Sequence, residues 1–133
     1  MSKIIKVTDL TRVQLDYAVF CAVYNVMRPT INTHEPKEVS FGGAPILMGK
    51  VIHLTYSGAY GSINYWHPSS DWEKAGRLIG LHIKMIELLD DGKWCAHTEN
   101  ASAYGETIMV AAMRAIVIEL SGIEVDIPKE LLE

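Results

Sequence analysis

Two long stretches of mostly apolar residues predict the two main helices of this protein. Residues 12–27 and 106–120 are apolar at so many positions that neither shows the alternation typical of a half-buried strand. Thr11 opens a capping-box sequence before the first stretch, and Pro29 stops that helix because the residue before a proline avoids helical geometry. Gly122 is placed to cap the end of the second helix.

Alternation of apolar and polar residues predicts the strands. Residues 3–7 form a short alternating run, which we expect to be an opening strand. Two hairpins follow, one pairing residues 50–57 with 62–66 and the other pairing 83–88 with 93–98. Each pair of alternating runs is separated by a glycine-containing turn, which favours a hairpin.

The segments between these elements complete the prediction of one domain. Residues 28–49 hold three prolines and three glycines with weak periodicity, which predicts a long connection of the kind that is usually functional or mobile. We also expect a short helix that ends near Gly80, a loop over residues 99–105, and a short terminal helix at Pro128. No repeat or linker interrupts the sequence, so the whole chain is predicted to be a single α+β domain with a small antiparallel sheet and two main helices.

Size, charge and cysteine content narrow the class of protein. A chain of 133 residues is long enough for one compact core and too short for two. The formal net charge of −4 argues against general affinity for DNA or RNA, whose phosphates attract lysine and arginine. We expect a cytoplasmic protein without membrane contact, because the N-terminus lacks an apolar signal segment and residues 108–118 are too short to cross a bilayer. The two cysteines do not have the spacing of a disulfide framework or of metal ligands, so we expect no metal site. The sequence also has no glycine-rich phosphate loop, and we expect no cofactor.

The two main helices also bear on assembly. Both lack a polar face, which is typical of helices that are buried on more than one side. A monomer of this size can hardly cover both, so we expect a homo-oligomer, either a dimer or a higher assembly such as a hexamer. The alternative is that both helices lie deep against one sheet.

Arg114 is the one charged residue inside the apolar part of the second helix. Burying an unpaired guanidinium is costly, so this side chain must meet an anion or a set of carbonyls. Thr107 and Ala111 share its helical face, which begins at a helix N-terminus that also attracts anions. A bound phosphate would fit this face. The alternative is a structural ion pair with Asp16 or Glu119.

Polar residues near these helices are further ligand candidates. Asn100 and Ser102 precede the second helix and could hydrogen-bond ribose hydroxyls or base edges, and Tyr104 could stack on a base. Ser69 and Ser70 belong to a polar turn and are candidates of the same kind. For all five, the alternative is a role in capping, in the core or on a solvated loop.

Two pairs of cationic or titratable residues give separate hypotheses. His82 and Lys84 stand two apart on a predicted strand, so they share a face and are candidates for a second anionic site around an oligomer axis; the alternative is a solvated surface. His53 and His67 each begin the H-x-[T/S] pattern of two-histidine phosphoesterases, and pairing of Ser57 with Gly61 would put both on one sheet face. This makes a cyclic-nucleotide phosphodiesterase the alternative to a binding protein.

A third class of function needs no small ligand. A scaffold or a transcription-modulating protein would keep Arg114 as a core ion pair.

Several short segments of the chain resemble the NinX-like phage family. Each is weak alone, but they occur in the family's order and spacing and span nearly the whole chain. They are residues 15–19 (LDYAV), 68–72 (PSSDW), 111–114 (AAMR), and 124–128 (EVDIP) with 130–132 (ELL). Within that family the sequence is most similar to the Thoeris anti-defence proteins of the first type.

This resemblance implies a phage protein that acts in the infected bacterial host without catalysis. Such proteins bind glycocyclic ADP-ribose, the signal made by bacterial TIR-domain enzymes, and sequester it without cleaving it. The resemblance also implies uptake of cyclic oligonucleotide signals by some members at a separate site in the oligomer. Arg28 and Arg114 match the pair of arginines that hold the signal's phosphates, and residues 30–49 make this chain longer than the shorter members.

Overall fold

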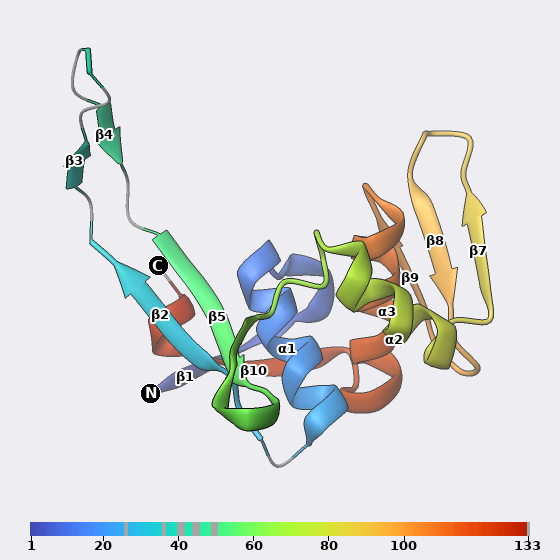
Figure 1. Ribbon diagram of the computed structural model, residues 1–133. Helices are drawn as coiled ribbons and strands as arrows, with labels where there is room; N and C mark the ends of the chain where they lie inside the picture. The colour runs from blue at the N-terminus through green and yellow to red at the C-terminus, as the bar shows by residue number, and fades with distance from the viewer. Residues whose placement is uncertain (26, 36, 40–41, 44–45, 49–50, 133) are drawn as a thin grey trace.

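The helices and strands of this protein form an α+β fold, as the sequence predicts. The computed structural model describes residues 1–25, 27–35, 37–39, 42–43, 46–48 and 51–132. Within these residues the helices are α1 (Arg12–Tyr24), α2 (Trp72–His82) and α3 (Ile108–Ser121), with 3₁₀ turns η1 (Val7–Asp9), η2 (Ala59–Gly61) and η3 (Lys129–Leu131). The strands are β1 (Ser2–Lys6), β2 (Thr30–His34), β3 (Lys37–Val39), β4 (Ile46–Met48), β5 (Val51–Ser57), β6 (Ile63–Tyr65), β7 (Met85–Leu88), β8 (Trp94–His97), β9 (Ser102–Gly105) and β10 (Glu124–Pro128) (Figure 1). In the described part of the chain these strands form four small antiparallel sheets, where the sequence predicted one.

Local capping signals begin and end the two main helices. At the start of α1 the main-chain N–H of Thr11 donates to Oε1 of Gln14 at 3.0 Å, which completes the predicted capping box. The hydroxyl of Thr107 caps α3 by accepting from the N–H of Val110 at 3.1 Å. Gly122 ends α3 with a φ of +99°, a conformation that favours glycine.

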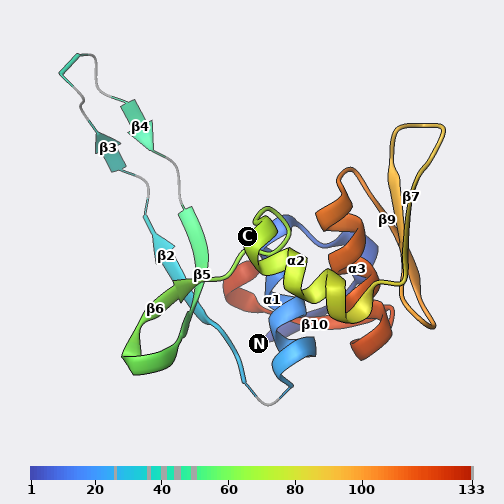
Figure 2. The ribbon, with the colours of Figure 1, turned by 45° about the vertical axis from the view of Figure 1, so that its right-hand side comes forward.

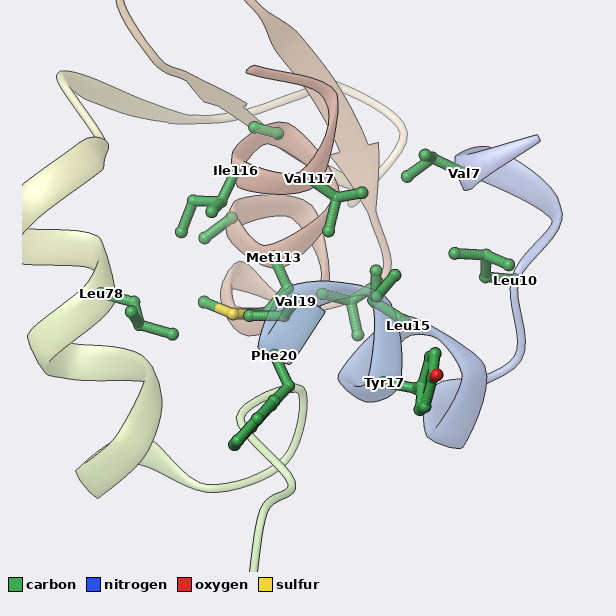
Figure 3. Close-up of a cluster of buried hydrophobic side chains, with 14 of the residues drawn as sticks. Val7, Leu10, Leu15, Tyr17, Val19, Phe20, Leu78, Met113, Ile116 and Val117 are labelled. Carbon is green, nitrogen blue, oxygen red and sulfur yellow. The ribbon is translucent and has the colours of Figure 1, made fainter. Parts of the chain in front are cut away.

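The core is built around α3, which is covered from several sides within one chain. Helices α1 and α2, strands β8, β9 and β10, and turn η1 all pack against it. Figure 3 shows Met113, Ile116 and Val117 of α3 facing side chains of α1 such as Val19 and Phe20. The apolar surface of α3 is therefore covered within one chain and does not require a partner subunit. The homo-oligomer stays a prediction, but the apolar character of α3 no longer supports it.

The predicted long connection over residues 28–49 is wrong in its described part, which forms strands. Helix α1 ends at Tyr24, earlier than predicted, and Asn25 has a φ of +53°. Strand β2 then pairs with β5 in a register that places Asn32 opposite His53, and β3 pairs with β4. In Figures 1 and 2 the β3–β4 pair lies away from the helices, beyond the β2–β5 pair, whose strand β5 packs on α1. The sequence prediction gave more weight to the prolines and glycines of this segment than to the β-branched residues of β2, which favour a strand.

The C-terminal half follows the predicted hairpin but differs around it. Strands β7 and β8 form the predicted second hairpin. The predicted loop over residues 99–105 is wrong at its end, because β9 pairs there with β8. Gly105 lets β9 approach α3, since an added Cβ would lie 2.5 Å from the main-chain nitrogen of Ala111. Strand β10 was not predicted and pairs with β1, while the predicted terminal helix is the short turn η3.

Two predicted placements are corrected by these boundaries. His82 is the last residue of α2 and Lys84 precedes β7, so they do not share the face of one strand. Strand β5 meets β6 with Ser57 opposite Ile63, so the pairing of Ser57 with Gly61 that would have put His53 and His67 on one sheet face does not occur. Among the described residues, none of the helices has the length and apolar character needed to span a membrane.

Candidate functional site

Arg114 lies on α3 beside strand β9 and is half-buried. One terminal nitrogen, Nη1, donates to the carbonyl of Tyr104 at 2.8 Å, whereas Nε is buried without a hydrogen-bond partner. Among the described residues no carboxylate forms an ion pair with this guanidinium. Asp16 accepts hydrogen bonds from Ser69 instead, and Glu119 accepts one from Asn100. The arginine is therefore held by a carbonyl and keeps an unneutralised positive charge.

The other candidates near Arg114 differ in how free their side chains are. The hydroxyl of Thr107 caps α3, Asn100 Nδ2 donates to Glu119 Oε1 at 3.3 Å, and Ser102 Oγ lies 2.7 Å from Nδ1 of His97. The ring of Tyr104 is 59% exposed, so it alone among these offers an open face for stacking.

Arg28 lies at a cavity of about 400 Å³ between α1, β1 and β10. Its Nη1 donates to the carbonyls of Asn25 at 2.9 Å and Met27 at 3.0 Å. Tyr17 and Cys21 line the same cavity, and burial raises the pKa of Tyr17 to about 12 and also raises the pKa of Cys21. Both groups are thus neutral near pH 7, and the phenol can donate a hydrogen bond.

Arg28 and Arg114 are not brought together within one chain. The cavity that Arg28 lines is completed by residues from the end of α3 and from β10, and Arg114 is not among them. Glu124 and Asp126 of β10 also line that cavity, so its charge is mixed. A single copy of the chain therefore presents the two arginines at separate places.

His53 and His67 do share a cavity, of about 260 Å³, although Ser57 does not pair with Gly61. The ring of His53 stacks on His34 with centroids 5.0 Å apart. Nδ1 of His67 lies 3.8 Å from Oδ2 of Asp71, and Ser70 lies at the cavity edge. Both histidines therefore line one cavity, as a two-histidine site requires.

The hydroxyl groups that follow these histidines are occupied by the protein. Ser69 is fully buried, and its N–H and Oγ donate to the carboxylate of Asp16 at 2.8 and 3.0 Å. Oγ1 of Thr55 accepts from Nδ2 of Asn32 at 3.0 Å. Burial raises the pKa of Asp16 to about 6, and the two hydrogen bonds from Ser69 oppose that shift. Ser69 and Thr55 thus support the fold at this place.

A polar cluster on the β7–β8–β9 sheet was missed by the sequence reasoning. Nε2 of His97 lies 3.0 Å from Oε2 of Glu87, Nδ1 lies 2.7 Å from Ser102, and the thiol of Cys95 is 3.5 Å from Nε2. These residues are adjacent because of the strand register, which the sequence alone does not specify. Among the described residues no group of three such side chains could hold a metal ion.

Comparison with known families gives a match over most of the chain. The family model described as Bacteriophage P22, NinX matches residues 6–120, a span that includes both Arg28 and Arg114. None of the curated proteins in the comparison matches the chain. The match bears out the NinX-like resemblance, and its description names no ligand or reaction.

Proposed function

We propose that this chain, which belongs to the phage P22 NinX family, binds glycocyclic ADP-ribose and sequesters it without cleaving it. Family membership supports a phage origin. The choice of ligand rests on the similarity to Thoeris anti-defence proteins of the first type and on the state of two arginines. In the cytoplasm of an infected bacterium, such binding would keep the TIR signal from its effector.

The observation that carries the proposal is that two guanidinium groups have no carboxylate partner among the described residues. Arg28 donates to two main-chain carbonyls, and Arg114 donates to one while its Nε has no partner. A guanidinium that meets only neutral acceptors keeps its charge available for an anion, which it can bind through paired, charge-assisted hydrogen bonds. The diphosphate of an ADP-ribose derivative supplies such anions.

The site that we propose is completed by a second copy of the chain. Arg28 and Arg114 lie at separate places in one copy, so one ligand reaches both only if Arg114 of one copy faces Arg28 of its neighbour. The two-stranded β3–β4 pair, which lies away from the helices, favours such contacts (Figure 2). A two-stranded ribbon is only marginally stable in water, and packing on a neighbour would stabilise it.

The alternative function is a cyclic-nucleotide phosphodiesterase, which the shared cavity of His53 and His67 favours. In such an enzyme one imidazole acts as general base and the other as general acid. The side chain of Ser69 argues against it, because the hydroxyl that the H-x-[T/S] pattern offers to a phosphate donates its hydrogen to Asp16.

A capture experiment separates the two functions. The protein is incubated with glycocyclic ADP-ribose, freed of unbound ligand, denatured by heat, and the released compound is identified by mass spectrometry. We expect intact ligand from the parent, from His53→Ala and from His67→Ala, and little from Arg28→Ala or Arg114→Ala. Lys3→Ala on the exposed strand β1 is the control and should capture like the parent.

The phosphodiesterase would give the opposite pattern. A cleaved product released by the parent, with intact ligand surviving only in a histidine variant, would contradict sequestration.

A further inference from the structure

A third cavity, which the sequence did not indicate, lies between α2, β5 and the end of α1. Its volume is about 280 Å³. One side is aromatic, with Tyr24, Tyr56 and Trp66, and the other is cationic, with Lys74 and Arg77. We refer to it as the α2 cavity.

The aromatic side of the α2 cavity is fixed by packing behind it. Phe20 is 1% exposed, and its ring centroid lies 4.6 Å from that of Tyr24 and 5.3 Å from that of Trp66. Tyr56 packs on Trp66 from β5, with ring centroids 5.7 Å apart. Tyr24 nevertheless remains 40% exposed. The cavity therefore offers the side of a rigid aromatic cluster to a planar ring.

The two cationic side chains of the α2 cavity form no ion pair with a carboxylate among the described residues. Nζ of Lys74 donates to the phenol oxygen of Tyr56 at 2.9 Å. The ammonium also lies 5.3 Å from the centroid of the Tyr56 ring, so the cationic side of the cavity is held against its aromatic side. The bond also raises the pKa of Lys74, which stays charged. Arg77 follows three residues later on the same helical face, is exposed, and forms no ion pair among the described residues.

The balance of charge distinguishes the α2 cavity from the other two. It has two cations against one carboxylate, Glu73. The cavity at Arg28 has one cation against two carboxylates, and the cavity at His53 and His67 has one cation, Arg12, against Asp16. Within a single copy of the chain, the α2 cavity is thus the best suited of the three to an anion that carries an aromatic ring, whereas the signal site proposed above requires a second copy.

We propose that the α2 cavity binds a nucleoside monophosphate, with the base against Tyr24 and Tyr56 and the phosphate between Lys74 and Arg77. The two neighbouring cations suit one phosphate, which accepts charge-assisted hydrogen bonds from both. Base–aromatic stacking supplies the second part of the affinity and tolerates different bases, because every base has a π-face. This site does not depend on the function proposed above.

Calorimetric titration of the full chain with AMP tests the proposal, with adenosine and ribose 5-phosphate as the two halves of the ligand. We expect AMP to bind more tightly than either half. Lys74→Ala and Arg77→Ala should each weaken AMP binding about tenfold or more, the loss typical of one hydrogen bond to a charged group. Lys3→Ala, the same change on exposed β1, should leave AMP binding unaltered.

The same variants distinguish this site from the proposed signal site. Arg28→Ala and Arg114→Ala should retain AMP binding, and Arg77→Ala should retain capture of glycocyclic ADP-ribose. Absence of AMP binding at millimolar concentration would overturn the proposal. So would equal binding of adenosine and AMP, or loss of AMP binding in Arg28→Ala but not in Arg77→Ala.

Discussion

Asp16→Asn should stabilise the protein at neutral pH, because the structure buries a carboxylate with too little compensation. Burial raises the pKa of Asp16 from 3.8 to about 6 against the lowering effect of its hydrogen bonds from Ser69. The folded chain therefore keeps a proton on Asp16 that the unfolded chain has already released between these two pH values. Stability is thus greatest below the unfolded value and falls as pH rises through the folded one. A shift of about two pKa units corresponds to a free energy on the order of 3 kcal/mol.

Urea unfolding, followed by tryptophan fluorescence, measures this effect as a difference between parent and variant. The asparagine side chain keeps the shape of the protonated carboxyl and can still accept from the N–H of Ser69. We expect the two proteins to be nearly equal at about pH 4 and the variant to be more stable by up to about 3 kcal/mol at about pH 7.5. A difference that is flat, or that favours the parent as pH rises, would refute the reasoning, since it would mean that the bonds from Ser69 outweigh burial.

Two substitutions and one measurement on the parent protein test the fold and the assembly. Gly105→Ala should lower the melting temperature by the equivalent of about 1–3 kcal/mol, because its Cβ would overlap the main-chain nitrogen of Ala111; an unchanged melt would contradict the close approach of β9 to α3. Thr107→Ala should cost about 1 kcal/mol in urea unfolding through loss of the α3 cap, and the cap would be unimportant if stability stayed the same. Light scattering at micromolar concentration should detect a homo-oligomer, and a monomer would exclude a ligand site shared between copies.

The sequence predicted the parts of the fold that depend on neighbouring residues. The capping box at Thr11 and the glycine at 122 act within one helical turn, so their signals are local and both are confirmed. Strand β10 depends on a partner at the opposite end of the chain, where Lys3 pairs with Ile127, and no local pattern specifies that contact. The strands within residues 28–49 were missed because proline and glycine content outweighed a short β-branched run.

The candidate site shows the same division. Arg114 was singled out because a lone charge in an apolar helix needs a partner, and the structure gives it a carbonyl where an ion pair was the alternative. The distance between Arg28 and Arg114 depends on how the helices pack, and the spacing of residues along the sequence does not predict it. The His97 cluster and the α2 cavity depend on strand register and on helix packing, respectively, and neither follows from sequence spacing.

The central claim is that Arg114 binds a phosphate of the signal, and calorimetric titration of Arg114→Ala with glycocyclic ADP-ribose, beside a ligand-free melt of the same variant, tests it most directly. Loss of one partner of a buried charge pair costs on the order of 2–5 kcal/mol, so affinity should fall by roughly thirty-fold to several thousand-fold. The ligand-free melt should stay close to that of the parent, because no carboxylate among the described residues loses a partner. Arg114→Lys should also bind poorly, since an ammonium lacks the planar fork of a guanidinium. Normal binding by Arg114→Ala together with a lowered melting temperature would contradict the claim and assign this arginine to the fold alone.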